Sequence, residues 1–262
     1  MLATSERPIT CDSCTSTEYM DLPFNADDDA RIIDTIRSRD PGAPFAYVVT
    51  PNVDHIVRLQ RSRSDLWPAY RGAWMVLCDS RILARLARQS GLRLPVLPGS
   101  DLTVRMFDAV LGPQDEVAIV GGDADALAKL VARYGLKRVA HHNPPMGFIN
   151  DPREVDRAAA FVVETRARYV FFAVGSPQQE ILAHRIERMG GAVGVGLCVG
   201  ASLDFLTGAQ VRAPVAMQRM SAEWLFRLST NPGRMWRRYL VDGPEIFALA
   251  HAWRRDHPLQ VL

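Results

Sequence analysis

Residues 169–182, YVFFAVGSPQQEIL, decide the fold. An apolar run typical of a buried strand is followed by a Gly-Ser-Pro turn, and Gln178, Gln179 and Glu180 then open a helix. Glycine lets a ligand approach the backbone closely, and Pro177 suits the first turn of a helix. Because a helix N-terminus favours anions, this strand–turn–helix unit predicts a site for a ligand that carries phosphate.

The same unit recurs from residue 116 onwards. Apolar runs at 117–120, 138–141, 169–174 and 192–199 alternate with helical stretches at 124–134, at 153–166 and after Pro177. This alternation is typical of an α/β fold, and it predicts a Rossmann-like parallel sheet with helices on both faces. Since ligands of such sheets bind beyond the carboxyl ends of the strands, we expect the turns at 121–122, 142–147, 175–179 and 200–204 on one edge.

Charge distinguishes the last part of the chain from the rest. The 262 residues are 48% hydrophobic, which is enough for a sizeable core, and the net charge is +2. Residues 211–262 hold eight arginines and four acids, so they carry +4 and leave −2 for the rest. We predict a flexible N-terminus over 1–20, an α/β core over 21–210 with parts 21–112 and 113–210, and a helical, basic appendage over 211–262.

Several function classes are excluded by missing patterns. No GxxxxGK[ST] indicates a P-loop NTPase, no GxSxG indicates a serine hydrolase, and the glycines at 194–200 miss the dinucleotide fingerprint by one residue. Cys11 and Cys14 form a lone CxxC with no second pair, so we expect no metal site there. The first residues do not resemble a signal peptide and no apolar run could cross a bilayer, which predicts a cytoplasmic protein.

Asp79 is the best candidate for a general base, because it is a carboxylate at the end of an apolar run, where partial burial can raise its pKa. The alternative is that it caps the helix starting at Ser80. Thr50 and Asn52 also follow a strand, and their alternative role is turn chemistry. His142 and Asp204 are candidate ligand contacts in two of the turns, with a solvated loop histidine and a helix cap as the alternatives.

Two charged segments leave more than one interpretation open. Asp27, Asp28 and Asp29 superficially resemble the DxD of metal-dependent sugar-nucleotide enzymes, but they open a helix before any strand, and the dipole of that helix alone explains them, which is the favoured interpretation. The basic tail, with arginines interleaved among aromatic residues, is either a solvated charged face, a surface for anionic lipid, or an RNA-binding segment. No recognised nucleic-acid module surrounds the tail, so RNA is the least favoured alternative.

Taken together, an ordered series of motifs resembles the WecG/TagA/CpsF family of bacterial glycosyltransferases over roughly residues 30–245. The matching pieces are TPN at 50–52 with Asp54 and His55, Asp79, GSDL at 99–102, VGG at 120–122, PPMGF at 144–148, GSPQQE at 175–180, GVG at 194–196 with Gly200, Asp204 and Phe205, RAP at 212–214, EWLFR at 223–227, Pro232 and RMWRRY at 234–239. One position departs from the pattern: the family commonly has Asp-Gly where this chain has Asp79-Ser80.

The resemblance implies an inverting, metal-independent transfer of a sugar from a UDP-sugar to a polyprenyl-diphosphate-linked saccharide, in cell-surface or exopolysaccharide biosynthesis. It implies that Asp79 is the general base with Thr50 beside it, and it requires no cofactor besides the UDP-sugar co-substrate. It also implies that Asn52 and Gln179 line the donor pocket. The turns at the strand ends add the other predicted substrate contacts, which are Gly121, Gly122, His142, Gly175, Gly200 and Asp204. Arg227, Arg234, Arg237 and Arg238 would contact the acceptor, the diphosphate or the membrane.

These expectations define the partners and one rival. The partners are the UDP-sugar, the lipid-linked acceptor and the inner face of the cytoplasmic membrane, where the protein would be peripheral. Nucleic acid is not expected, and a homo-oligomer is left open. The rival is a non-catalytic nucleotide-binding or regulatory protein on the same α/β scaffold, and no motif names the transferred sugar.

Overall fold

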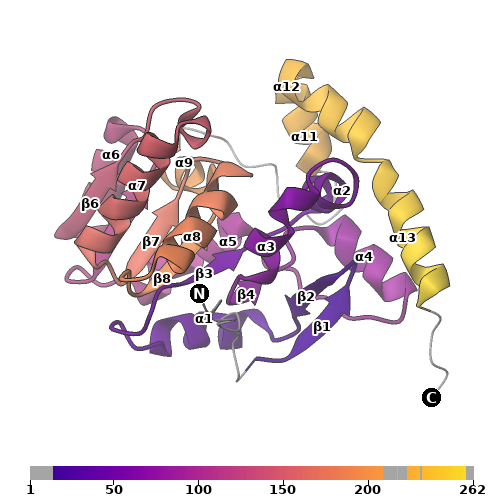
Figure 1. Ribbon diagram of the computed structural model, residues 1–262, viewed down its shortest axis with the longest axis horizontal. Helices are drawn as coiled ribbons and strands as arrows, with labels where there is room; N and C mark the ends of the chain where they lie inside the picture. The colour runs from indigo at the N-terminus through magenta and orange to yellow at the C-terminus, as the bar shows by residue number, and fades with distance from the viewer. Residues whose placement is uncertain (1–13, 209–216, 218–222, 231, 258–262) are drawn as a thin grey trace, which may run out of the picture.

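A six-stranded parallel sheet forms the centre of the protein (Figure 1). The structure is a computed structural model that describes residues 14–208, 217, 223–230 and 232–257. In chain order the strands of the sheet are β3 (Ala46–Val49), β4 (Met75–Val76), β5 (Glu116–Val120), β6 (Arg138–His142), β7 (Tyr169–Phe172) and β8 (Val195–Cys198). They lie in the order β4-β3-β8-β7-β5-β6, and every neighbouring pair is parallel, which confirms the expected sheet.

Helices and helical turns connect the strands. They are α1 (Asp29–Ser38), α2 (Val53–Arg61), η1 (Ser64–Leu66), α3 (Trp67–Arg71), α4 (Arg81–Gln89), α5 (Gly99–Arg105), η2 (Met106–Val110), α6 (Ala124–Tyr134), η3 (Phe148–Asn150), α7 (Pro152–Thr165), α8 (Gln178–Met189) and α9 (Ser202–Thr207). Helix α5 begins at Gly99, with Pro98 in the cap position.

Each face of the sheet has its own hydrophobic core, because successive side chains of a strand point to opposite faces. One core joins Val49, Val120 and Phe172 to α2, α3, α4, α7 and α8. The other joins Val48, Ile119 and Phe171 to α1, α5, α6 and α9. The helices therefore cover both faces, as the alternation of apolar runs predicts.

The direction in which the chain moves across the sheet reverses between β5 and β7. The chain leaves β5 toward β6 and leaves β7 toward β8, in opposite directions along the strand order. Accordingly α6 packs on one face and α8 on the other. Loops that diverge in this way open a crevice beyond the carboxyl ends of the strands, where α/β proteins bind ligands.

A hairpin corrects the expected flexible N-terminus. Residues 1–13 lie outside the described part of the chain, but Ser16–Tyr19 form β1 and pair with β2 (Leu22–Asn25) in an antiparallel ladder. Tyr19 and Met20 are fully buried in the core. A flexible segment over 1–20 is therefore wrong for residues 16–20, since burial of these large side chains holds the hairpin against the sheet domain.

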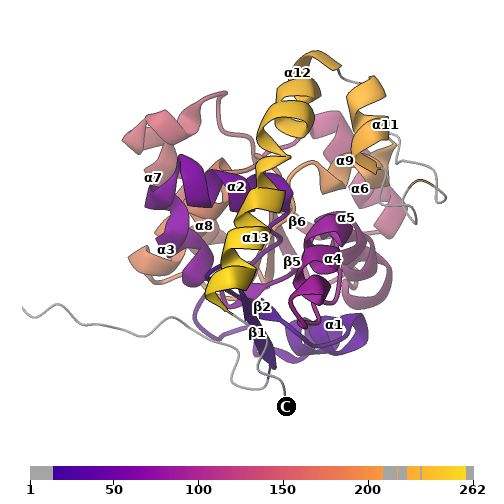
Figure 2. The ribbon, with the colours of Figure 1, turned by 90° about the vertical axis from the view of Figure 1, so that its right-hand side faces the viewer.

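The C-terminal part is helical where the structure describes it. Its elements are α11 (Glu223–Thr230), α12 (Pro232–Arg237), the π-helical turn η4 (Arg238–Asp242) and α13 (Glu245–Asp256). Figure 2 shows α13 running along the core beside α2 and α4. Ile246 and Ala250 enter the same core as α8, and Trp253 meets Tyr19 edge to face at 4.9 Å. The last helix thus packs as part of the core, although it lies in the expected appendage.

Candidate active site at the carboxyl edge of the sheet

The parallel sheet brings most of the candidate residues to one edge. Thr50 follows β3, Asp79 follows β4, Gly121 follows β5 and Gly200 follows β8. Since all six strands run the same way, the residues that follow them lie at the same end. The predicted turns therefore share an edge, as expected.

Asp79 and Thr50 are brought together by the backbone. The N–H of Asp79 donates to the carbonyl oxygen of Pro51 at 3.1 Å, which places Asp79 next to the strand end that carries Thr50. The buried Thr50 hydroxyl donates to the carbonyl oxygen of Cys198 at 3.3 Å, so it also joins β3 to β8. The strand ends that carry the two proposed catalytic residues are thus adjacent.

The cap of α4 belongs to Ser80, where the family pattern commonly has glycine. The Ser80 hydroxyl accepts from the N–H of Leu83 at 3.2 Å. The alternative role of Asp79 as the cap is therefore filled by its neighbour. Asn52, by contrast, does cap α2, because its side-chain oxygen accepts from the N–H of Asp54 at 3.1 Å. The turn chemistry considered for Asn52 is present.

Gln179 is built into the protein. It is only 3% exposed, its side-chain oxygen accepts from the N–H of Gly200 at 2.8 Å, and its amide nitrogen donates to Glu180 at 2.9 Å. The side chain expected to contact ligand therefore uses both ends to bind the loop after β8 and its own helix. In this arrangement the Gln179 side chain holds the loop after β8 from inside the protein.

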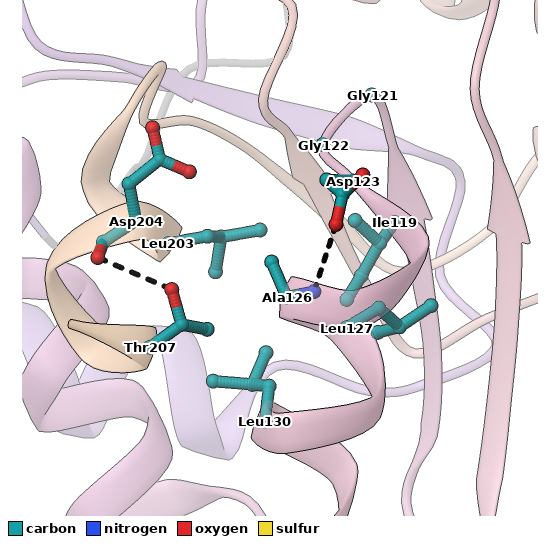
Figure 3. A pocket seen from close by; sticks show the side chains of 10 residues that line it. All are labelled: Ile119, Gly121, Gly122, Asp123, Ala126, Leu127, Leu130, Leu203, Asp204 and Thr207. Atoms are coloured by element: carbon teal, nitrogen blue, oxygen red, sulfur yellow. Dashed lines mark hydrogen bonds between the residues drawn. The ribbon is translucent and has the colours of Figure 1, made fainter. Parts of the chain in front are cut away.

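A pocket opens where α6 and α9 meet, beside the Gly121-Gly122 turn (Figure 3). It encloses about 260 Å³, including space open to solvent. The residues that line it are Ile119, Gly121, Gly122, Asp123, Ala126, Leu127, Leu130, Leu203, Asp204 and Thr207. Three predicted residues, Gly121, Gly122 and Asp204, are therefore brought together around an apolar floor.

The two glycines of this turn differ in their surroundings. Both have positive φ, at 90° for Gly121 and 81° for Gly122. A Cβ on Gly121 would lie 2.7 Å from Val174, whereas a Cβ on Gly122 would meet no atom within 4 Å. Gly121 is thus required by close packing against the end of β7, and Gly122 faces open space at the pocket.

Acids rather than cations stand at this pocket. Asp123 caps α6, accepting from the N–H groups of Asp125 at 2.9 Å and Ala126 at 3.1 Å, so the helix N-terminus already holds a carboxylate. Asp204 lines the opposite side (Figure 3). Carboxylates accept hydrogen bonds from hydroxyl and N–H groups and repel phosphate. The lining of the pocket therefore favours hydroxyl or N–H groups over phosphate.

His142 lies away from the pocket. Its ring packs on Phe161 of α7 with the ring centroids 5.3 Å apart, and burial lowers its pKa below the usual range. The neighbouring His141 approaches the glycine turn instead, with Nε2 3.0 Å from the carbonyl oxygen of Gly121. Side chains alternate across β6, which is why these two consecutive histidines face opposite sides of the sheet.

The Gly175–Ser176–Pro177 turn has partners that sequence reasoning missed. Gly175 has φ 79°, and a Cβ added to it would meet no atom within 4 Å, so its open side faces space. The Ser176 hydroxyl accepts from Nη2 of Arg58 at 2.7 Å and lies 3.4 Å from the hydroxyl of Tyr70. Arg58 and Tyr70 come from α2 and α3, which lie far from this turn in the sequence.

The remaining candidates are the arginines of the C-terminal helices and the three acids near the N-terminus. Arg237 is exposed and lies 3.9 Å from Asp242, while the side chains of Arg227, Arg234 and Arg238 lie outside the described part of the structure. No helix within the described ranges is both long and apolar enough to cross a bilayer.

The three N-terminal acids are used by the fold. Asp27 accepts from both the N–H and the hydroxyl of Thr15 at 2.9 Å, Asp28 caps α1, and Asp29 pairs with Arg105 at 2.7 Å. Among the described residues no group of three or more His, Cys, Asp or Glu is arranged to hold a metal ion. The helix-opening interpretation of this acidic run is the one that these contacts support.

The sequence of the chain is similar to those of known glycosyltransferases. A protein from Bacillus spizizenii named N-acetylglucosaminyldiphosphoundecaprenol N-acetyl-beta-D-mannosaminyltransferase is 33% identical over 151 residues, covering 55% of this chain and 55% of that protein. The chain thus spans about half the length of this curated relative. The profile of the glycosyl transferase WecG/TagA/CpsF family matches residues 17–259. The resemblance of the ordered motifs is therefore confirmed, and the chain belongs to the glycosyl transferase WecG/TagA/CpsF family.

Proposed function

We propose that this protein transfers a sugar from a UDP-sugar to a polyprenyl-diphosphate-linked saccharide, with inversion at the anomeric carbon and without a metal ion. The proposal rests on one observation. The pocket lined by Asp123 and Asp204 lies on the same edge of the sheet as the strand ends that carry Asp79 and Thr50. The name of the Bacillus spizizenii relative supports a lipid-linked diphosphate acceptor.

The donor would lie across the strand ends. The pocket at β5 accepts the base or ribose, and Asp79 follows β4, four strand positions away. Neighbouring strands are spaced about 4.8 Å apart, so the two points are separated by about 19 Å, on the scale of an extended nucleotide sugar. The diphosphate and sugar would then pass over the glycine turns at Gly175 and Gly200.

Asp79 is the proposed general base. Its carboxylate removes the proton of the acceptor hydroxyl while that oxygen forms a bond to the anomeric carbon, and the bond from that carbon to the UDP oxygen breaks on the opposite face. A positioned base contributes about 10²–10⁴-fold to such a step. Ser80 caps α4, so the fold does not require Asp79 for that purpose.

Cations of the C-terminal helices would stabilise the departing diphosphate. Arg234, Arg237 and Arg238 lie in or next to α12, and preorganised donors facing developing negative charge are a large contribution in many enzymes. We propose that these arginines replace a metal ion, since Asp27–Asp29 are engaged in caps and ion pairs. Activity that survives chelation by EDTA would support this, and activity restored only by a divalent ion would contradict it.

The same helices would bind the membrane surface. Leu225, Trp236, Leu240, Val241 and Phe247 are large exposed apolar side chains on α11, α12, η4 and α13. Exposed arginines lie among them at Arg237, Arg254 and Arg255. Apolar and basic side chains together are typical of helices that lie in the headgroup region of anionic membranes. We propose a peripheral protein on the inner face of the cytoplasmic membrane.

The direct test is incubation with a panel of UDP-sugars and a polyprenyl-diphosphate acceptor mimic. We expect one UDP-sugar to be consumed, with UDP and extended lipid formed in equal amounts. UDP should also raise the melting temperature and NAD should not. UDP binding without transfer from any donor would favour the rival, a non-catalytic nucleotide-binding protein.

A further inference from the structure

Glu180 is a fully buried carboxyl that the proposed mechanism does not use. It is 0% exposed, and its Oε1 accepts a hydrogen bond from the amide nitrogen of Gln179 at 2.9 Å. The amide oxygen of Gln179 in turn accepts from the N–H of Gly200 at 2.8 Å. Three groups thus form one directional chain, from the loop after β8 through Gln179 to Glu180.

This chain of hydrogen bonds starts at Gly200, just before the helix that forms one wall of the pocket. Gly200 has φ 55° and is followed by α9, whose residues Leu203 and Asp204 line the pocket. The N–H of Gly200 also donates to the carbonyl oxygen of Phe172 at 3.1 Å, so two acceptors hold this position. Anchoring Gly200 therefore fixes the position from which the α9 wall of the pocket starts.

Glu180 also defines which way the Gln179 amide points. An amide side chain can turn over and exchange its oxygen and nitrogen, and only the observed orientation offers the oxygen to Gly200. An acceptor at Glu180 selects this orientation, because it requires the nitrogen on its side. Without that acceptor, the buried amide nitrogen would lose its partner, and only the N–H of Gly200 would still favour this orientation.

A second hydrogen bond stabilises the turn that leads into α8. Nη2 of Arg58 donates to Ser176 at 2.7 Å, and the guanidinium lies near enough to Glu180 to act on its charge. The turn before α8 is thereby held by α2, the helix that follows Thr50 and Asn52. The loop after β8 is thus held by the first turn of α8, and the turn after β7 is held by α2.

We propose that Glu180 is a positioning residue for the nucleotide-donor pocket, which it organises through Gln179 and the backbone of Gly200. The inference rests on the proposed function, because it takes the pocket to be the donor site. Burial raises the pKa of the Glu180 carboxyl and favours its neutral form, so glutamine is a close mimic in shape and charge.

Three variants test this. Glu180→Gln keeps an acceptor oxygen for Gln179, whereas Glu180→Met keeps an unbranched side chain of similar volume but removes the acceptor. Ile186→Ala, in the same helix and fully buried, is the matched control for lost stability alone. Each is measured for UDP affinity by calorimetry, for KM and kcat with the donor, for unfolding in denaturant, and for hydrogen exchange at the amide of Gly200.

We expect Glu180→Gln to keep UDP affinity within about twofold and Glu180→Met to weaken it by about five- to tenfold, the effect of one hydrogen bond. KM should rise more than kcat falls, and exchange at Gly200 should accelerate in Glu180→Met alone. Equal UDP affinity in Glu180→Met and wild type, or an equal loss in Ile186→Ala, would overturn the positioning role. Absence of UDP binding by the wild type would instead overturn the proposed function, and the inference with it.

Discussion

The side-chain oxygen of Gln179 accepts a hydrogen bond from the backbone N–H of Gly200 across 2.8 Å. The contact ties the first turn of α8 to the loop after β8, and it is made by a side chain that is almost completely buried. Gln179→Leu should therefore lower the free energy of unfolding by about 1–3 kcal/mol, because it removes both hydrogen bonds of a buried side chain and takes the donor away from the buried Oε1 of Glu180. Urea denaturation measures this loss. Gln60→Leu, which removes an exposed contact to Asp21, is the control and should change stability by less than about 0.5 kcal/mol.

The Gly121-Gly122 turn offers a second matched pair. Both glycines have positive φ, so alanine at either position costs about 1–2 kcal/mol for the left-handed backbone. Only Gly121→Ala also drives a methyl group against Val174 and the backbone of Ala173. Thermal unfolding should show Gly121→Ala as clearly the less stable of the two. Equal stability would mean that the turn is free to move away from β7.

Glu180 should make the stability depend on pH. Burial raises its folded pKa above the value near 4.5 of the unfolded chain, and this outweighs the opposing influence of Gln179, Ser176 and Arg58. The folded state then binds more protons, so this contribution is complete below pH 4.5 and is lost as pH rises toward the folded pKa. The free energy of unfolding of Glu180→Gln minus that of the wild type should therefore increase from about pH 4 upwards. A difference that does not change with pH would show that folding does not raise the pKa of Glu180.

Two neighbours on α13 should separate packing from membrane binding. Ile246 is buried and Phe247 is 57% exposed. Ile246→Ala should cost about 2–5 kcal/mol of stability, because it leaves a cavity under the helix. Phe247→Ser should leave stability nearly unchanged but weaken flotation with anionic vesicles. This pair is a better test than removal of the tail, since truncation would also uncover the core that α13 covers. Flotation equal to that of the wild type in Phe247→Ser combined with Trp236→Ser would contradict the membrane proposal.

The alternation of apolar runs and helices was sufficient to predict the parallel sheet and the shared edge. The β1–β2 hairpin was missed because its turn residues, Met20 and Asp21, adopt positive φ of 50° and 64° without the glycine or asparagine that signals such a turn. The burial of Gln179 and Glu180 was not visible in the sequence, because both are polar residues at the start of a helix.

The sequence predicted which strand ends form the candidate site, but it did not predict what each side chain contacts there. Gly121, Gly122 and Asp204 do meet at one pocket, because their positions follow from the strand order. The separation of His141 from His142 and the contact of Arg58 with Ser176 depend on side-chain direction and on packing between distant segments. A single sequence contains no periodic signal for contacts of that kind.

The most direct measurement is transfer by Asp79→Asn in the presence of the accepted UDP-sugar and acceptor. The substitution keeps the shape of the side chain and removes its ability to take a proton. Asp156→Asn, a matched change at an exposed ion pair with Arg185, is the control. We predict that Asp79→Asn binds UDP like the wild type and that its kcat falls by about 10²–10⁴-fold, while Asp156→Asn remains fully active. Wild-type turnover in Asp79→Asn would contradict the assignment of Asp79 as the base.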